Sequence, residues 1–138
     1  DISDEDHVLE AGLGFAVKLD KPASRFGDFI GRDAVQSKKQ NGLQKRLVRF
    51  KLTDPELLLY HNEPILRDGK IVGYLTSGNY GHHLAGAIGL GYVKCGMAGE
   101  SKEDQLNSSY SIDVAGKIIE AEVSFKPMYD PKAAQVRR

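Results

Sequence analysis

The sequence lacks most of the features that mark specialised protein classes. Its 138 residues include no tryptophan and a single cysteine, Cys95. A lone cysteine cannot form an internal disulfide, so a reducing cytoplasm is the expected location. No apolar run approaches the roughly 20 residues that cross a bilayer, and the N-terminal residues lack the pattern of a signal peptide. We therefore expect a cytoplasmic protein with no membrane partner.

Net charge is also absent, because 19 basic residues balance 19 acidic ones. The chain therefore has no overall field that attracts polyanions, and nucleic acid is not an expected partner. His82 and His83 are adjacent and would point to opposite faces of an extended backbone, so they do not predict a metal site. The acidic residues form no pair whose spacing argues for acid–base catalysis. The sequence thus predicts neither a catalytic residue nor a metal ligand.

The first 42 residues differ in character from the rest. Leu13, Phe15, Val17 and Leu19 recur with period two, which predicts a strand with one buried face over residues 9–19. Residues 32–41 are predicted to form a short helix that ends before a glycine. The chain starts without an initiator methionine, and we expect it to come from a longer protein.

From residue 43 onward the patterns are almost all typical of β-strands. Val48, Phe50 and Leu52 alternate with basic residues, and Asp68-Gly69 lies between two strand-like runs, which is a hairpin signal. About six short strands are expected over residues 43–126, with glycine-punctuated and polar loops at 76–83 and 96–107. The predicted fold is mainly β: a small antiparallel six-stranded barrel or jelly-roll-like domain with a short N-terminal α+β extension from a preceding domain.

Few residues stand out as candidates for chemistry. Gly86 to Gly91 lacks the glycine spacing of a phosphate loop, and we interpret it as close backbone packing in the barrel. Tyr80 or His82 would line a cleft shared with another domain, or would be exposed loop residues. Lys38, Lys39, Lys45 and Arg46 form either a solvated basic edge or a patch that binds carboxylates. Cys95 is expected to be a buried or half-buried small hydrophobe.

Several segments, in order, resemble the glycine cleavage T-protein family. Residues 9–18 and 28–34 resemble the end of its folate-binding core, and residues 126–131 resemble the subgroup fused behind a flavin-dependent amine dehydrogenase, such as dimethylglycine oxidase, dimethylglycine dehydrogenase and sarcosine dehydrogenase. The segments that resemble its C-terminal barrel are Arg46-Leu47-Val48, Glu63-Pro64-Ile65, Asp68-Gly69, Val72-Gly73, Thr76-Ser77-Gly78 and Leu90-Gly91-Tyr92-Val93.

The resemblance implies a three-part ring with tetrahydrofolate in a central funnel. The catalytic Asp and the pterin-anchoring Glu of the family would lie upstream of this chain, as would FAD if the fused form applies. Residues 1–42 would be the tail of the folate-binding domain, and residues 43–138 the C-terminal barrel. Lys21 and Arg46 are the nearest matches to the family's folate-contacting residues, whereas Tyr80 and His82 come from the loop argument above.

Two functions follow as hypotheses. The chain is the terminal module of a tetrahydrofolate-dependent aminomethyltransferase or of a folate-linked N-methyl-amine dehydrogenase, inactive alone, with the upstream domains of the same polypeptide and folate as partners. The alternative is a non-catalytic interaction or regulatory barrel module, as in a relative associated with pyruvate dehydrogenase phosphatase. In either case the apolar face of Leu13, Phe15 and Val17 is expected to pack on a missing domain and to be exposed without it.

Overall fold

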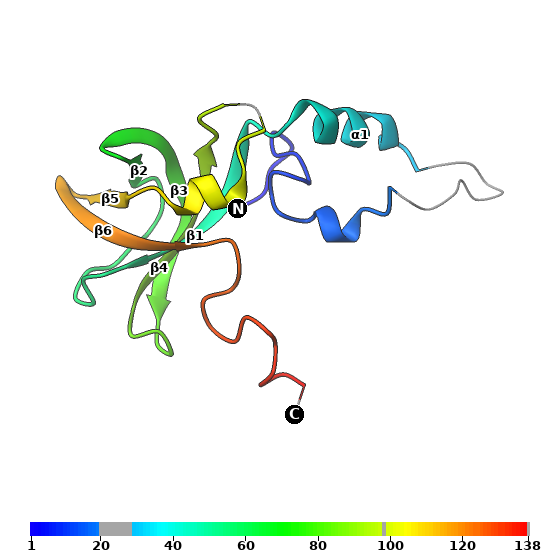
Figure 1. The fold of residues 1–138 in the computed structure, drawn as a ribbon. Helices are drawn as coiled ribbons and strands as arrows, with labels where there is room; N and C mark the ends of the chain where they lie inside the picture. The colour runs from blue at the N-terminus through cyan, green and yellow to red at the C-terminus, as the bar shows by residue number, and fades with distance from the viewer. Residues whose placement is uncertain (20–28, 98, 138) are drawn as a thin grey trace.

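A closed six-stranded antiparallel barrel forms the body of the protein. The computed structural model describes residues 1–19, 29–97 and 99–137. Figure 1 shows the barrel on one side, with the N-terminal segment and helix α1 (Arg32–Asn41) extending from it. The strands are β1 (Lys45–Leu52), β2 (Pro64–Arg67), β3 (Lys70–Gly81), β4 (Gly86–Lys94), β5 (Tyr110–Val114) and β6 (Lys117–Ser124).

The barrel closes because β1 has a partner on each side. It pairs with β4 from Lys45 to Lys51 and with β6 from Arg49 to Leu52, which gives the order β1-β4-β3-β2-β5-β6. Closure leaves no open sheet edge, which is the feature that makes isolated sheets prone to self-association. The prediction of a small six-stranded antiparallel barrel is confirmed.

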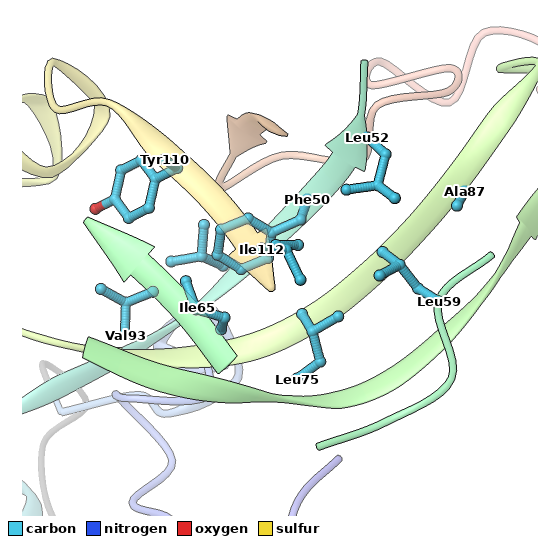
Figure 2. Packing of buried hydrophobic residues seen from close by; sticks show 10 residues of the cluster. Phe50, Leu52, Leu59, Ile65, Leu75, Ala87, Val93, Tyr110 and Ile112 are labelled. Atoms are coloured by element: carbon cyan, nitrogen blue, oxygen red, sulfur yellow. The ribbon is translucent and has the colours of Figure 1, made fainter. Parts of the chain in front are cut away.

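Alternating side chains fill the interior of the barrel. On β1 the residues Val48, Phe50 and Leu52 are buried, while the basic residues between them lie on the outer face. The Phe50 and Tyr110 rings meet edge to face at 5.9 Å, a favourable geometry for two aromatic rings. Figure 2 shows the aliphatic core around them; its buried members are Val48, Phe50, Leu52, Leu59, Ile65, Leu75, Ala87, Val93, Tyr110 and Ile112.

The predicted hairpin turn is confirmed. Asp68 and Gly69 join β2 to β3 with φ values of 51° and 79°, and Ala115 and Gly116 join β5 to β6 with similar values of 52° and 85°. Positive φ at both central residues matches the right-handed twist of the flanking strands. An Asp-Gly dipeptide adopts this turn at little cost, because glycine has no Cβ to clash.

Two predicted loops are instead partly regular structure. Strand β3 continues through residues 76–81, where Tyr80 pairs with Ala87, although a glycine-punctuated loop was expected over 76–83. The glycine at position 78 is used for close approach, since a Cβ there would lie 2.4 Å from the Leu59 carbonyl carbon. Within the polar stretch 96–107, helix α2 (Lys102–Leu106) forms with Ser101 as its N-cap.

The extension contains the predicted helix but not the predicted strand. Helix α1 spans the expected residues and ends at Gly42, whose φ of 83° suits only glycine. Residues 9–19, however, form turns and the short 3-10 helix η1 (Gly14–Ala16). A strand needs a neighbouring strand along its length to satisfy its backbone, but here the Glu10 carbonyl meets the Leu47 amide of β1, and the segment that follows makes local turn bonds instead. The strand prediction is therefore wrong for this chain by itself.

Glu10 holds the extension against the barrel. Its carbonyl accepts a hydrogen bond of 2.8 Å from the Leu47 amide, and its carboxylate accepts from the Gln44 amide and from Lys38 Nζ at 3.0 Å. Burial acts to raise the pKa of Glu10, but the hydrogen bonds from Lys38 and Gln44 outweigh it and lower the pKa overall. Lys45 and Asp6 form a second ion pair of 2.6 Å. The first turn of the chain is thus tied to β1.

We expect Gly91→Ala to lower the free energy of unfolding by about 1–3 kcal/mol, the usual cost of overpacking a core. A Cβ at this position would lie 2.5 Å from Ile65 Cδ1 and 2.7 Å from the Tyr74 carbonyl oxygen. Urea unfolding measures the change. The control is Gly96→Ala, where the nearest atom would be 3.7 Å away. Equal stability of the two variants would contradict the interpretation of residues 86–91 as close packing.

Candidate functional site

Arg46 lies at one end of the barrel, on the inward-facing side of β1. It precedes Val48 by two residues and therefore points to the same side of the sheet. Its Nη1 donates to Gln105 Oε1 at 3.0 Å and contacts Cys95 Sγ at 3.5 Å, and its Nη2 donates to the Glu100 carbonyl oxygen at 2.5 Å. The guanidinium thus joins β1 to the segment that carries α2.

Glu100 is held in turn by Arg67, at the end of β2. Arg67 Nη2 and Nη1 donate to the two Glu100 carboxylate oxygens at 2.6 and 3.1 Å, and Arg67 Nε donates to Ser108 Oγ at 2.7 Å. A paired fork of this kind is among the stronger polar contacts in proteins. These hydrogen bonds hold the pKa of Glu100 below its ordinary value of 4.5, against burial that acts to raise it. We call Arg46, Arg67, Glu100 and Gln105 the end cluster.

Cys95 takes part in this end of the barrel as a neutral thiol. Its sulfur lies 3.5 Å from both Arg46 Nη1 and Gln105 Nε2. Burial raises the pKa of the Cys95 thiol, although the Arg46 charge acts in the opposite direction. A raised pKa disfavours the thiolate that a nucleophile needs. The prediction that Cys95 is a buried or half-buried small hydrophobe rather than a nucleophile is consistent with this geometry.

A groove of about 680 Å³ separates the extension from the end cluster. Among the described residues, its charged lining side chains are Lys39, Arg46 and Lys102, and none of its described lining residues is acidic. The remainder is apolar or glycine: Leu9, Gly12, Gly14, Phe15, Val17, Leu19, Gly42, Leu43 and Gly99. We call it the basic groove. An apolar wall beside several cations suits a ligand with a flat apolar body and carboxylate groups.

The predicted binding residues do not gather in one place. Arg46 lines the basic groove, and Lys21 lies outside the described residues. Tyr80 and His82 are at the end of β3, with their rings edge to face at 5.2 Å, and neither is among the lining residues of the basic groove. Lys102 also lines the basic groove, but the sequence analysis did not predict it as a binding residue because residues 96–107 were expected to form a polar loop.

A second groove of about 440 Å³ lies on the outer face of the barrel, under the C-terminal segment. Arg49, Ile88 and Leu90 form part of its floor, and Pro127, Met128 and Tyr129 cover it. Arg49 Nη1 donates to the Phe125 carbonyl oxygen at 2.7 Å, and the His83 and Tyr129 rings lie 4.5 Å apart. These contacts fasten the C-terminal segment to the barrel wall.

The described residues contain no group of three or more His, Cys, Asp or Glu side chains that could hold a metal ion. Over the same residues, no helix has the length and apolar character needed to cross a membrane. The described residues define a barrel domain with a cation-lined groove that it shares with its extension.

The family follows from comparison with known proteins. The profile of the glycine cleavage T-protein C-terminal barrel domain matches residues 45–130, and the chain belongs to this family. Its match covers all six strands and α2. The resemblance noted in the sequence is thereby confirmed, and the matched residues begin at β1, just after the extension.

The relatives include an oxidase, an aminomethyltransferase and a dehydrogenase. The chain is 34% identical to 4-methylaminobutanoate oxidase (formaldehyde-forming) of Paenarthrobacter nicotinovorans over 99% of its length, and 40% identical to an aminomethyltransferase of Synechocystis over 86%. It is 30% identical to human mitochondrial sarcosine dehydrogenase over 99%. It spans only 15%, 31% and 14% of the lengths of these three relatives, respectively.

A solved structure shows the same fold. The aminomethyltransferase T of the glycine cleavage system from Bartonella henselae superposes on 86% of this chain with a TM-score of 0.66 and 21% sequence identity. The chain covers 31% of that structure. The barrel is thus a component of a larger protein in this relative.

We expect Glu100→Gln to lower the free energy of unfolding by about 1–2 kcal/mol at pH 7, because it removes the charge that Arg67 pairs with. The folded-state pKa of Glu100 is depressed, so its contribution is present above its ordinary value of 4.5 and is lost as pH falls through the folded value. Denaturant unfolding from pH 7 to pH 3 should therefore show a shallower acid loss in the variant than in the natural chain.

The matched control for this measurement is Glu103→Gln, an exposed carboxylate three residues further on, in the first turn of helix α2. It should change stability by only a few tenths of a kcal/mol. If Glu100→Gln and Glu103→Gln gave the same unfolding curve at every pH, the end cluster would have no role in stability.

Proposed function

We propose that this chain is the C-terminal module of a tetrahydrofolate-dependent aminomethyltransferase-like enzyme. In the intact polypeptide, a flavin-dependent N-methyl-amine dehydrogenase of the dimethylglycine or sarcosine type precedes it and passes a one-carbon unit to tetrahydrofolate. The family match and the relatives that carry an oxidase or dehydrogenase name support this proposal. Residues 1–42 are then the tail of the folate-binding domain, and the protein acts in the cytoplasm.

The observation that carries the folate assignment is the basic groove. Tetrahydrofolate has an aromatic body and a glutamate tail, and the groove offers an apolar wall with Lys39, Arg46 and Lys102. The Nη groups of Arg46 already donate within the end cluster, so Arg46 contributes charge more than free donors. Lys39 and Lys102 also line the groove, and their ammonium groups can donate to a carboxylate, although Lys102 Nζ lies 5.3 Å from the centre of the Phe125 ring in this structure. The groove therefore suits the tail of the ligand.

The described part of the groove does not suit the pterin ring. Recognition of the pterin edge needs acceptors for its N–H groups, and the lining residues that the structure describes include no carboxylate, amide or hydroxyl side chain. The pterin, the one-carbon transfer and the FAD thus belong to residues upstream of this chain. In this proposal the barrel closes one side of the folate funnel, and the fragment alone is inactive. Lys21, Tyr80 and His82 stay predictions as further wall residues.

Calorimetric titration of tetrahydrofolate tests the proposal. Binding is expected to the full-length parent protein and not to the 138-residue chain, because the chain supplies only the tail side of the funnel. Binding to neither protein would overturn the proposal and would favour a non-catalytic interaction or regulatory module. Binding to the isolated chain alone would overturn the assignment of the pterin to upstream residues.

In the full-length parent, Lys102→Ala should raise the dissociation constant for tetrahydrofolate about three- to tenfold, since one solvent-accessible charge contact to the tail is lost. Lys117→Ala, at the β5–β6 turn and outside the groove lining, is the matched control. Melting temperatures of both variants check that neither unfolds. No difference in affinity between the two variants would remove Lys102 from the binding site.

A further inference from the structure

The segment after β6 bridges one wall of the barrel and leaves space beneath it. Residues 127–129 cover a groove of about 440 Å³, whose floor belongs to β1, β3 and β4. Contacts hold the segment at both ends: Arg49 Nη1 donates to the Phe125 carbonyl oxygen at 2.7 Å, and the ring centres of His83 and Tyr129 lie 4.5 Å apart. We call this space the outer groove. Its volume lies within the usual range of small-molecule pockets.

The strand register gives the floor of the outer groove an apolar middle and polar sides. Arg49 of β1 pairs with Leu90 of β4, and Leu90 pairs with Ser77 of β3, so these three side chains form one row on the outer face. In the next row, Asn79 of β3 pairs with Ile88 of β4. An apolar strip along β4 therefore runs between one basic residue of β1 and two neutral polar residues of β3.

The polar side chains of this floor have hydrogen-bond donors to spare. Arg49 uses one of its five N–H groups on the Phe125 carbonyl, and among the described residues no carboxylate lies within 4 Å of its guanidinium. The Ser77 hydroxyl and the Asn79 side-chain N–H groups have no acceptor in the described part of the chain. None of the described lining residues is acidic. The outer groove thus offers a positive charge and several donors to an acceptor from outside.

These features together select one kind of ligand. A carboxylate accepts charge-assisted hydrogen bonds from a guanidinium, often two in parallel. An aliphatic chain attached to it would lie on the strip of Leu90 and Ile88, beneath Met128, whose unbranched side chain adapts to irregular shapes. A polyanion fits less well, because Arg49 is the single cationic residue among the described lining residues.

We propose that the outer groove binds a small aliphatic carboxylic acid, with its carboxylate on Arg49 and its chain along β4. The described lining residues of this groove and of the basic groove have no member in common. The proposed site is therefore separate from the one assigned to the folate tail, and it does not rest on the proposed function.

Calorimetric titration with octanoate tests the proposal, on the 138-residue chain and on the full-length parent. The dissociation constant for octanoate is expected to be on the order of 0.1 mM in both proteins. Octanol, which has the same chain length but no charge, should bind about tenfold more weakly, because it forms no charge-assisted bond with Arg49. Absence of octanoate binding, or equal affinity for the two probes, would overturn the proposal.

Substitutions at Arg49 and at a matched residue test the role of the charge. Arg49→Gln should weaken octanoate binding about tenfold and leave octanol binding unchanged, whereas Arg49→Lys, which keeps the charge, should retain most of the affinity. Lys51→Gln removes an equal charge from the same face of β1, outside the groove lining, and should change the affinity by less than about twofold. Equal effects of Arg49→Gln and Lys51→Gln would overturn the proposal.

A third substitution tests where the probe binds. Ser77→Phe places a ring on the floor of the outer groove and should block octanoate and octanol alike, while its melting temperature checks that the barrel is intact. Unchanged binding of both probes to this variant would overturn the proposal, because the probes would then bind elsewhere.

The basic groove and the upstream polypeptide are the two competing explanations. Lys102→Ala should leave octanoate binding unchanged; a loss there, with no effect of Arg49→Gln, would assign the carboxylate to the basic groove and overturn the proposal. Binding to the 138-residue chain but not to the parent would also overturn it, because upstream residues would then fill the outer groove. Since the folate titration depends on Lys102 and the octanoate titration on Arg49, either proposal can fail while the other holds.

Discussion

The pairing of β1 with β6 is the constraint on which the rest of the structure depends, because it turns a strip of strands into a closed surface. Strand β1 has partners on both sides, its inner face holds Val48 and Phe50, and its outer face is available to the extension and to the C-terminal segment. An open sheet of this size would expose two edges and half of its core. With closure, the barrel has a complete core of its own. The extension and the C-terminal segment pack on it from outside.

A closed barrel still leaves its core open at each end. At the end where Arg46 lies, polar side chains cover the core. Tyr110 lies at the edge of the core, and in Figure 2 its hydroxyl points away from the aliphatic side chains. Next to it, the end cluster joins the start of β1 and the end of β2 to the segment that carries helix α2. Arg46 of β1 donates to Gln105 of α2 and to the Glu100 carbonyl, and Arg67 of β2 donates to the Glu100 carboxylate. Because Arg46 also lines the basic groove, the group that closes the barrel contributes to the charge of the candidate ligand site. Arg46 therefore both stabilises the end of the barrel and contributes charge to the candidate ligand site.

Local patterns in the sequence predicted most of the barrel, and they failed where the structure depends on long-range contacts. The alternation on β1 and β6, the Asp68-Gly69 turn and the end of α1 at Gly42 are set by residues close in sequence. By contrast, the glycines in residues 76–81 resembled a loop, although Gly78 is small because Leu59 lies against it. The pairing of Arg67 with Glu100 joins residues 33 positions apart and has no local signal. The same limit applies to the groove, since Lys39 on α1 and Lys102 on α2 lie far apart in the sequence and only the tertiary structure places both in its lining.

The bonds of Glu10 and Asp6 also determine where this domain can be separated from its neighbours. The composition of the chain changes near residue 42, but the Leu47 amide, the Gln44 amide and Lys45 all bind residues upstream of that point. A gene exchange with a breakpoint at residue 42 would leave β1 with these groups unpaired, whereas a breakpoint before Asp6 would carry the whole set of contacts along. The segment that must be exchanged as a whole to keep these contacts is therefore longer than the barrel itself, because it includes the residues from Asp6 onward that bind to β1.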